Sequence, residues 1–483
     1  MCGVIGIFGK NDVVHELYAS LISLQHRGQD SAGIVTYNTT FHLKKGNGLV
    51  NKVFNEKNLA RLKGNIGIGQ TRYPTIGPGG VEDAQPFIVN APFGIAMAHN
   101  GNVTNYSELR DELTKKCYRQ LTSYSDVEVI LNVFADEMSM QPLHDFSFET
   151  LIKTVSGVME RVEGSYSVVG MIANIGMFAF RDPYGIKPLC LGKKDNSYIV
   201  ASESVILDHL EYDFMRDIVP GEVIFIDTKR KLHSKIINAK CAHPCIFEWV
   251  YFARPDSIID KIEVYEARLR LGEKLGKTCL AAKIKPDVIV PIPDSGRGAA
   301  MAIAKALGVE QKEGLIKNYY IGRTFIMSKQ SVRKNSVRQK LNPVKSVIKG
   351  KNVLLIDDSI VRGTTAKELV SIIRKAGAKK VYYAVTCPPL RYPCVYGIDM
   401  MTRGEFVARN RNLNEIKKKI GADALIYQTL SDMCSAVRGS NLNQKFCTAC
   451  FTGEYPTGLD KRDILKLEKE RIKIQKLDKE KGI

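Results

Sequence analysis

The order of secondary structure after Cys245 constrains the fold of this chain more than any other feature. Short apolar segments of the strand type alternate there with helical segments, at 288–290, 299–307, 353–356, 366–376 and 381–385. Such alternation predicts a parallel sheet with helices on both faces, because each crossover helix must pack back onto the sheet. We therefore predict an α/β domain with a parallel sheet over residues 245–457.

Residues 2–235 show a different pattern. Short alternating apolar segments separated by Gly and Asn turns lie at 4–8, 66–69, 94–98, 167–171 and 177–180. A helical segment covers 13–25, and another begins at Ser125, where Ser125 and Glu128 are predicted to form a capping box. The pattern indicates an α+β domain rich in antiparallel strands. The predicted boundary lies within 236–245, and the charged tail 458–483 is predicted to be a solvated helix.

The composition excludes several classes of protein. The chain has 483 residues, 44% hydrophobic and 25% charged, which is the balance of a globular protein rather than a disordered or fibrous one. The longest apolar stretch, 168–180, contains Asn174 and falls short of the roughly 18 residues that a membrane-spanning helix needs. No basic segment precedes the first apolar run, so no secretory signal is expected. The predicted compartment is the cytoplasm.

The net charge of +19 is concentrated in one part of the chain. Residues 314–356 contain ten Lys or Arg and no Asp or Glu. A basic excess favours nucleic acid, anionic lipid or phosphorylated small molecules as partners. Charge alone leaves open an RNA-binding loop and a lid over a phosphorylated substrate. The position of the segment between two phosphate-binding motifs, described below, favours the lid.

Cys2 becomes the first residue of the chain when the initiator Met is removed. Its α-amino group then titrates near neutrality. That group lies close enough to act as the base for the Cys2 thiol, directly or through a water molecule. A cysteine beside the start codon also arises by chance, so this feature alone does not decide between the two interpretations.

Four motifs in the first half of the chain favour the interpretation of Cys2 as a nucleophile. They lie at 25–33, 69–75, 98–102 and 125–126. Together they resemble the glutaminase domain of the amino-terminal-nucleophile glutamine amidotransferases. The resemblance implies that residues 2–235 fold as an αββα sandwich. His99, inside the third motif, is expected to be structural.

The resemblance assigns a chemical task to each matched residue. Arg72 is expected to bind the carboxylate of glutamine, and Asp126 to pair with its ammonium group. The side-chain amide of Asn100 and the backbone N–H of Gly101 are expected to donate to the oxyanion that forms when Cys2 attacks the amide carbon. Taken singly, Arg72 also fits a surface ion pair, Asp126 a charge at a helix start, and Asn100 with Gly101 a hairpin turn.

Residues 353–365 comprise a buried strand, two acids, a small-residue loop and a helix start. Such a loop offers N–H groups and hydroxyls to a phosphate, although two acids at a strand end also fit a plain helix cap. The run resembles the 5-phosphoribosyl-1-pyrophosphate (PRPP) motif of type I phosphoribosyltransferases. The resemblance implies that Asp357 and Asp358 bind the ribose hydroxyls together with Mg²⁺. The remaining PRPP contacts that it implies in this loop are Ser359, Arg362, Gly363, Thr364 and Thr365.

Further segments resemble the same family. Residues 291–298 look like its pyrophosphate-binding loop, with Ser295 as a further contact on the Mg²⁺ side, but Gly296 and Arg297 stand where relatives often have small polar residues. Residues 319–326 and 333–341 resemble the mobile loop that closes over PRPP. Closure would bring cations to the pyrophosphate and exclude water. The PRPP-binding cations expected from this region are Lys317 and Arg323.

The chain has eleven cysteines, which in a cytosolic protein favours metal-binding or catalytic thiols over disulfides. Four of them, at positions 245, 394, 447 and 450, could together bind a metal. Four thiolates suit either an iron–sulfur cluster or tetrahedral Zn²⁺, and the spacing of these cysteines leaves both open. The positions resemble those of a structural [4Fe–4S] cluster in the iron–sulfur-containing branch of the glutamine PRPP amidotransferases. The expected ligands are Cys245, Cys394, Cys447 and Cys450. Cys241 and Cys387 are alternative ligands, and the ordinary apolar side chains are expected to be Cys117, Cys190, Cys279 and Cys434.

Residues 2–457 as a whole resemble the glutamine PRPP amidotransferases. The resemblance implies that glutamine forms a thioester with Cys2, and that the released ammonia displaces pyrophosphate from PRPP to give 5-phosphoribosylamine. This is the first committed step of de novo purine (IMP) biosynthesis. Purine nucleotides are implied as feedback inhibitors and a homotetramer as the assembly, without a nucleic-acid or membrane partner. No long extension precedes Cys2, so no propeptide cleavage is expected.

Three alternative functions from other protein classes remain. A glucosamine-phosphate synthase would share the first half, but the run at 353–365 argues against its sugar-isomerase domains. A non-catalytic PRPP-sensing regulator that binds nucleic acid would have no use for Cys2, Arg72 and Asp126 together. A purely structural iron–sulfur or zinc scaffold would need neither half of the chain.

Overall fold

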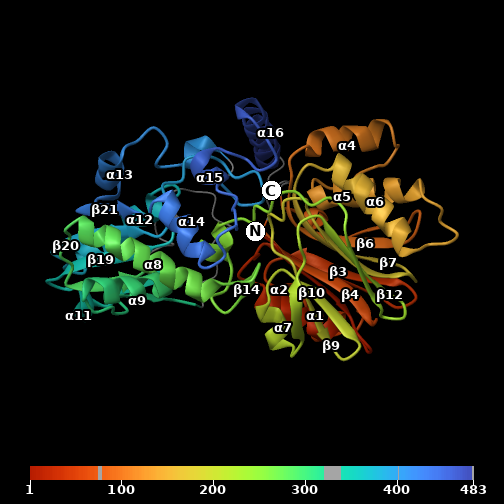
Figure 1. The fold of residues 1–483 in the computed structure, drawn as a ribbon, viewed down its shortest axis with the longest axis horizontal. Helices are drawn as coiled ribbons and strands as arrows, with labels where there is room; N and C mark the ends of the chain where they lie inside the picture. Colours follow the sequence, from red (N-terminus) through yellow and green to blue (C-terminus); the bar gives the residue numbers. More distant parts are fainter. Residues whose placement is uncertain (74–78, 320–338, 401, 481–483) are drawn as a thin grey trace.

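The computed structural model describes residues 1–73, 79–319, 339–400 and 402–480, and they form two domains side by side (Figure 1). The first domain contains two antiparallel sheets, with strand orders β11-β9-β10-β1-β4-β2-β3 and β13-β12-β8-β7-β6-β5. Their strands are β1 (Gly3–Phe8), β2 (Ser31–Tyr37), β3 (Phe41–Asn47), β4 (Ile66–Arg72), β5 (Phe87–Val89), β6 (Ile95–Val103), β7 (Gly164–Ile172), β8 (Gly176–Arg181), β9 (Cys190–Lys194), β10 (Ser197–Ala201), β11 (Asp213–Asp217), β12 (Glu222–Asp227) and β13 (Leu232–Ile236).

The two sheets face each other across a shared apolar core that includes Val4, Ile68, Val169 and Ile224. Helices cover the outer faces because alternate side chains of each strand point outward and are also apolar. Leu17 of α1, for example, packs with the outward-facing side chains of the first sheet. The helices of this domain are α1 (Val14–Ser23), α2 (Val50–Val53), α3 (Glu56–Leu59), η1 (Val81–Asp83), α4 (Tyr106–Lys115), α5 (Asp126–Ser139), α6 (Phe148–Arg161) and α7 (Val205–His209). The predicted αββα sandwich is confirmed.

The second domain is built on a parallel sheet of order β16-β19-β20-β21, with strands β16 (Val288–Pro291), β19 (Asn352–Asp357), β20 (Lys380–Val385) and β21 (Ala424–Tyr427). Leu354 packs toward α8 (Val264–Ala281) and α9 (Gly296–Leu307). Its neighbour Leu355 lies in the core on the other face, together with apolar residues of α12 (Thr364–Lys375). The predicted parallel sheet with helices on both faces is therefore confirmed.

Shorter elements connect the domains and complete the second one. They are η2, a π-helix (Glu248–Phe252), β14 (Ile258–Ile259), β15 (Ile262–Glu263), β17 (Leu315–Lys317), β18 (Leu341–Pro343), α11 (Lys345–Ile348), η3 (Arg403–Glu405), α13 (Leu413–Ile420), α14 (Leu430–Arg438), α15 (Ala449–Thr452) and α16 (Lys461–Glu480). The predicted boundary segment, 236–245, joins the end of β13 to the residues that precede η2. None of the described helices is both long and apolar enough to span a bilayer.

The predicted capping box at the start of α5 is wrong. Ser125 is the N-cap residue, but within the described residues its hydroxyl has no hydrogen-bond partner. The Glu128 carboxylate instead accepts hydrogen bonds from the N–H groups and hydroxyls of Thr122 and Ser123, at 2.7–2.8 Å. The segment before the helix supplies four donors to one carboxylate, which outweighs the single N-cap contact that the sequence pattern suggested.

The carboxyl-terminal segment is helical, as predicted, but it is not simply solvated. Arg471 of α16 is buried, and its guanidinium donates to the carbonyl of Cys394 at 3.0 Å. Glu468 accepts from the backbone and side chain of Arg403 at 2.7 Å. The hydroxyl of Ser107 in α4 donates to Glu470 at 3.0 Å. The helix therefore contacts both domains, which its dense charge pattern did not reveal.

The segment 394–400 of the second domain lies against the end of β6 in the first. Asn102 donates to the carbonyl of Val395 at 2.8 Å, and Ser165 donates to the carbonyl of Tyr396 at 3.0 Å. A Cβ on Gly397 would lie 2.8 Å from the carbonyl oxygen of Gly101. This close approach places the second domain beside the strand that carries Asn100 and Gly101.

Candidate active sites

Cys2 lies immediately before β1, buried at the junction of the two domains, close to the amino terminus marked in Figure 1. Its backbone N–H donates to Oδ1 of Asn100 at 3.2 Å, and its Sγ lies 3.6 Å from the carbonyl oxygen of Tyr73. Met1 precedes it and is also buried. Cys2 and Asn100 come from different sheets, so the stacking of the sheets brings them together.

Asn100 offers a free donor at this position. Its Nδ2 is buried and has no hydrogen-bond partner among the described residues. The next residue, Gly101, has a φ of +156°, and a Cβ there would lie 1.9 Å from the carbonyl oxygen of Ser165. Only glycine fits such a close approach of the backbone. An unpaired amide donor beside a buried thiol can stabilise an anion that forms at that thiol.

Arg72 and Asp126 lie at the same end of the sandwich, where β4 ends and α5 begins, and both are buried. Burial would raise the pKa of Asp126, but His99, Arg72 and the N–H of Val103 outweigh it and keep that pKa below its usual value. Nε2 of His99 lies 2.9 Å from Oδ1 of Asp126. The predicted structural residue His99 therefore contacts a predicted binding residue directly and orients it.

Sequence reasoning missed three residues around Cys2. The motif at 25–33 contains Arg27, whose Nε donates to the carbonyl oxygen of Cys2 at 3.0 Å. Its guanidinium also bonds to Glu203 and Glu248, both buried. The position of Arg27 within the motif at 25–33 was the available signal. The two glutamates lie far away in the sequence and belong to none of the motifs.

The acid pair at the end of β19 forms the centre of the second site. Ser295 and Ser359 each donate to a carboxylate oxygen of Asp358 at 2.5 Å, and the hydroxyl of Tyr383 donates to Asp357. Burial and the neighbouring Asp358 charge raise the pKa of Asp357 to about 8. Burial also raises the pKa of Asp358, against the opposing effect of its two serine donors. Two adjacent carboxylates, of which Asp358 is buried and Asp357 half-buried, favour a bound cation.

The loop after the acid pair ends in a helix N-terminus. Gly363, with a φ of +75°, precedes α12, and Thr364 and Thr365 form the first turn of that helix. The loop therefore presents hydroxyls and unpaired N–H groups, as a phosphate site requires.

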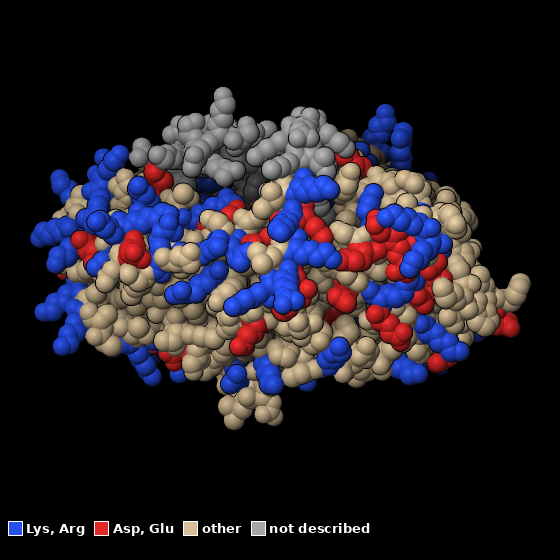
Figure 2. All heavy atoms as spheres, turned by 90° about the horizontal axis from the view of Figure 1, so that it is seen from above, with Lys and Arg blue, Asp and Glu red and all other residues tan. Residues whose placement is uncertain are grey.

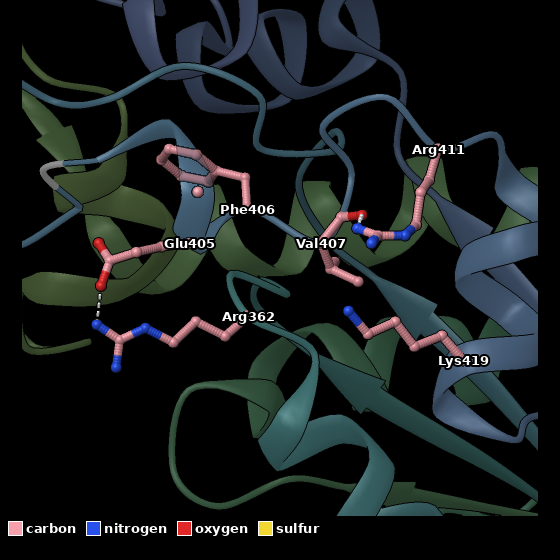
Figure 3. A pocket seen from close by; sticks show the side chains of 7 residues that line it. Arg362, Glu405, Phe406, Val407, Arg411 and Lys419 are labelled. Carbon is pink, nitrogen blue, oxygen red and sulfur yellow. Dashed lines mark hydrogen bonds and ion pairs between the residues drawn. The ribbon is translucent and has the colours of Figure 1, made fainter.

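A basic pocket of about 310 Å³ adjoins this loop (Figure 3). Arg362 lines it and pairs with Glu405. Arg411 donates to the carbonyl of Val407 at 3.1 Å, and the Lys419 side chain points into the same space. Arg362 was predicted from the sequence, but Arg411 and Lys419 were not.

The predicted pyrophosphate loop is held by cations. Asp294 accepts from Arg297 at 2.6 Å and from Lys317 at 2.5 Å, so Lys317 faces this loop. Arg297 also pairs with Glu313. These ion pairs explain why an arginine stands at a position where relatives often have a small polar residue. A Cβ on Gly296 would lie 2.5 Å from the carbonyl of Ile356 in β19. Residues 320–338, with Arg323, and residues 74–78 lie outside the described residues.

The four predicted ligand cysteines converge in the structure, and all are buried. Cys245 and Cys447 form a β-bridge. The carbonyl of Cys450 accepts from Arg391 and Tyr392 at 3.0 Å, just before Cys394 in the chain. Burial first, and then the charge of the other three cysteines, raises the pKa of the Cys450 thiol.

The four side chains are of the donor type that a metal centre takes, because thiols are soft ligands. Lys187 is fully buried, and the neighbouring Cys245, Cys394, Glu248 and Cys447 raise its pKa against burial. A buried cation therefore faces the thiols. Within the described ranges, no group of three or more His, Cys, Asp and Glu is arranged to hold a metal ion. The cluster assignment thus depends on the chemistry and proximity of the four thiols.

Cys241 and Cys387, the alternative ligands, differ in position. Cys241 is exposed, whereas Cys387 is buried and its thiol donates to the carbonyl of Pro388 at 3.3 Å.

Positive charge is distributed unevenly over the surface. Figure 2 shows Lys and Arg gathered at the end formed by the second domain, while Asp and Glu mix with them over the first. Cations also line the basic pocket and face Asp294. The described part of the chain therefore presents positive charge close to the acid pair.

Comparisons with known proteins agree with the two domains. The family model of a glutamine amidotransferase domain matches residues 77–209, and that of a phosphoribosyl transferase domain matches residues 260–393. The amidophosphoribosyltransferase of Pseudomonas aeruginosa is 48% identical over 95% of this chain and 93% of its own length. That of Escherichia coli is 47% identical over the same shares.

A solved structure resembles the whole chain. It is the glutamine PRPP amidotransferase of B. subtilis in complex with ADP and GMP, which is 36% identical. It superposes with a TM-score of 0.84 and covers 94% of this chain and 97% of its own. The likeness extends over both domains and their arrangement.

Proposed function

The chain belongs to the amidophosphoribosyltransferase family, and we propose that Cys2 and the acid pair Asp357–Asp358 are the reactive centres of its two half-reactions. The enzyme combines a glutamine amidotransferase domain with a phosphoribosyltransferase domain, consistent with a role in purine biosynthesis. The observation that carries the residue assignment is the unpaired Nδ2 of Asn100 beside the buried Cys2.

In the first half-reaction, the Cys2 thiol attacks the side-chain amide carbon of glutamine. Negative charge develops on the amide oxygen, and Nδ2 of Asn100 together with the N–H of Gly101 stabilises it. The intermediate collapses to a thioester and releases ammonia, and water then hydrolyses the thioester to glutamate. Removal of Met1 would free the α-amino group of Cys2 to accept the thiol proton and return it to the leaving ammonia.

Substrate binding in this domain uses complementary charges. Arg72 binds the α-carboxylate of glutamine, and Asp126 binds its α-ammonium group. Asp126 is suited to this task because His99 and Arg72 keep its pKa low despite its burial. Its carboxylate is therefore ionised at neutral pH.

In the second half-reaction, ammonia displaces pyrophosphate from C1 of PRPP. Asp357 and Asp358 bind the ribose hydroxyls, and the Thr364–Thr365 end of the loop binds the 5′-phosphate. Lys317 and Arg323 supply positive charge to the pyrophosphate. Ammonia is protonated in bulk water and then cannot act as a nucleophile, so the contact between β6 and segment 394–400 supports internal transfer between the sites.

Two cofactors belong to this proposal. Asp357, Asp358 and Ser295 supply the oxygen donors that Mg²⁺ prefers, and the ion would neutralise charge on the pyrophosphate. Cys245, Cys394, Cys447 and Cys450 would hold a [4Fe–4S] cluster, which ties the start of the second domain to its end. Tetrahedral Zn²⁺ is the alternative. Iron, sulfide and zinc analysis of anaerobically purified protein separates the two.

The remaining parts of the proposal concern regulation and assembly. The B. subtilis relative was solved with ADP and GMP, which supports purine nucleotides as feedback inhibitors of this chain. A homotetramer and a cytoplasmic location complete the proposal. Inhibition assays with individual nucleotides and sedimentation equilibrium test the first two.

Replacement of Cys2 tests the central assignment. We expect Cys2→Ala to abolish glutamine-dependent formation of pyrophosphate and glutamate while ammonia-dependent pyrophosphate release persists. Cys190→Ala is the matched control, since Cys190 is also buried in the first domain but its thiol donates to the carbonyl of Ala201. Glutaminase activity in Cys2→Ala would overturn the assignment. Loss of the ammonia-dependent activity as well would contradict the separation of the two sites.

A further inference from the structure

A buried charge network surrounds the backbone of the nucleophile. The guanidinium of Arg27, with no exposed surface, donates to the carbonyl of Cys2 at 3.0 Å, to Glu203 at 2.5 Å and to both carboxylate oxygens of Glu248 at 2.8 and 3.0 Å. Glu203 also bonds to His26 at 2.8 Å. Every member except His26 is buried, so removal of Arg27 would leave two buried carboxylates without their shared cation.

Glu248 is the member that comes from the second domain. It is the first residue of the π-helix η2, and its N–H donates to the carbonyl of Cys245 at 3.1 Å. The guanidinium of Arg268, in α8, donates to the carbonyls of Trp249 and Ala253 at 2.9 and 2.8 Å. The position of the Glu248 carboxylate is therefore set by the core of the second domain.

The same segment contacts Glu203 from the other side. The N–H of Arg254 and the hydroxyl of Ser257 donate to Oε2 of Glu203 at 3.0 and 2.8 Å. Arg27 thus contacts Cys2 through one nitrogen and the two glutamates through the other two. Glu248 belongs to the second domain, and Glu203 links Arg27 to Arg254 and Ser257 of that domain. A displacement of segment 248–257 must shift the Arg27 guanidinium, because its bidentate bond to Glu248 admits one geometry.

We propose that Glu248 is a positioning residue for the glutaminase reaction. Through Arg27 it holds the carbonyl of Cys2, and it makes the alignment of the thiol with Asn100 depend on the docked position of the second domain. This inference rests on the proposed role of Cys2 as nucleophile. It adds to that role a residue of the other domain that contacts neither substrate.

The structure supplies a matched control for Glu248→Gln. Arg181 in the first domain forms a bidentate bond with Asp260 of the second at 2.8 and 2.9 Å, and its side chain is also buried. Asp260→Asn therefore removes one carboxylate charge from an interdomain arginine pair of the same kind. No contact joins Asp260 to Cys2, Arg27 or Asn100 in the described structure.

The experiment compares the two full-length variants with the unmodified enzyme. The readouts are kcat and KM for glutamine, the rate of Cys2 alkylation by iodoacetamide, ammonia-dependent pyrophosphate release, and the midpoint of thermal unfolding. We expect Glu248→Gln to lower the glutaminase kcat and the alkylation rate about tenfold to 100-fold, because small misplacements of a reacting group have effects of that size. Ammonia-dependent activity should stay within about twofold. Asp260→Asn should leave the glutaminase kcat, the alkylation rate and the ammonia-dependent activity unchanged.

Equal glutaminase losses in the two variants, or a loss confined to the KM for glutamine, would overturn the proposal. If Glu248→Gln does not fold, Ser257→Ala provides a milder perturbation of the same network and should lower kcat in the same direction. An unchanged kcat in Ser257→Ala would then count against the inference. Failure of the proposed function is separate, since it would show as glutaminase activity in Cys2→Ala.

Discussion

Replacement of Asn100 by Ala tests the most specific geometric claim about the first site. Asn100 makes two contributions there. Its Oδ1 accepts the N–H of Cys2 at 3.2 Å, and its buried Nδ2 has no partner among the described residues. Because the ground state leaves this donor unpaired, its full hydrogen-bonding capacity is available to the oxyanion of the transition state.

The expected loss follows from that difference. Removal of one donor from an oxyanion hole costs about 10²–10³ in kcat, or roughly 2.7–4 kcal/mol of transition-state stabilisation. Since Nδ2 acts on the transition state, the KM for glutamine should change little. Asn100→Asp keeps an acceptor for the N–H of Cys2 but puts an oxygen in place of the donor. We expect its loss to equal or exceed that of Asn100→Ala.

The assay is the initial rate of glutamate release with PRPP and Mg²⁺ present, alongside pyrophosphate release with ammonia as the nitrogen source. Both variants should keep the ammonia-dependent rate. A glutaminase kcat within tenfold of the unmodified enzyme for Asn100→Ala would refute the assignment of Nδ2. An Asn100→Asp variant with near-normal kcat would show that only the Oδ1 contact matters.

Three further predictions concern other parts of the molecule. Gly101→Ala places a Cβ 1.9 Å from the carbonyl of Ser165, so it should destabilise the fold by about 2 kcal/mol or more and abolish glutaminase activity. Gly404→Ala is the control, because its added Cβ meets nothing within 4 Å. Its free energy of unfolding in chemical denaturation should equal that of the unmodified enzyme. Asp357→Asn should abolish pyrophosphate release with both glutamine and ammonia, and retention with either nitrogen source would contradict the role of the acid pair. Burial opposes ionisation of Glu203, but His26 and Arg27 outweigh burial and lower the pKa of Glu203 from 4.5. The ionised Glu203 therefore stabilises the fold above pH 4.5, and this stabilisation is lost as the pH falls. In Glu203→Gln the free energy of unfolding in urea should fall less steeply with acidification, and a pH dependence equal to that of the unmodified enzyme would argue against this role of Glu203.

Local sequence patterns predicted much of the architecture, because periodicity depends on neighbouring residues alone. The alternation of strands and helices after Cys245 predicted the parallel sheet, and the run at 353–365 predicted a strand, loop and helix where β19 and α12 lie. The capping box at Ser125 failed for a nonlocal reason. Glu128 found four donors in a segment whose path depends on the packing of the domain.

The candidate sites show the same contrast between local sequence patterns and nonlocal contacts. Motif residues such as Cys2 and Asp357 were predicted as site residues because their types and spacing resemble known families. The partners that align them were not found, since His99 meets Asp126 only across the junction of a strand and a helix. Arg411 and Lys419 were likewise missed, because they reach the basic pocket from a part of the chain far from the loop that follows Asp358.

The sequence alone determined the order of elements, the two-domain plan and the residue types that carry the chemistry, since these depend on local periodicity and side-chain identity. Only the tertiary structure decided which distant charges meet. Arg27 and Glu248 lie in different domains, and α16 joins both domains through Arg471 and Glu470. Buried charges must be paired, but many pairings satisfy that requirement, and the packed backbone selects one of them.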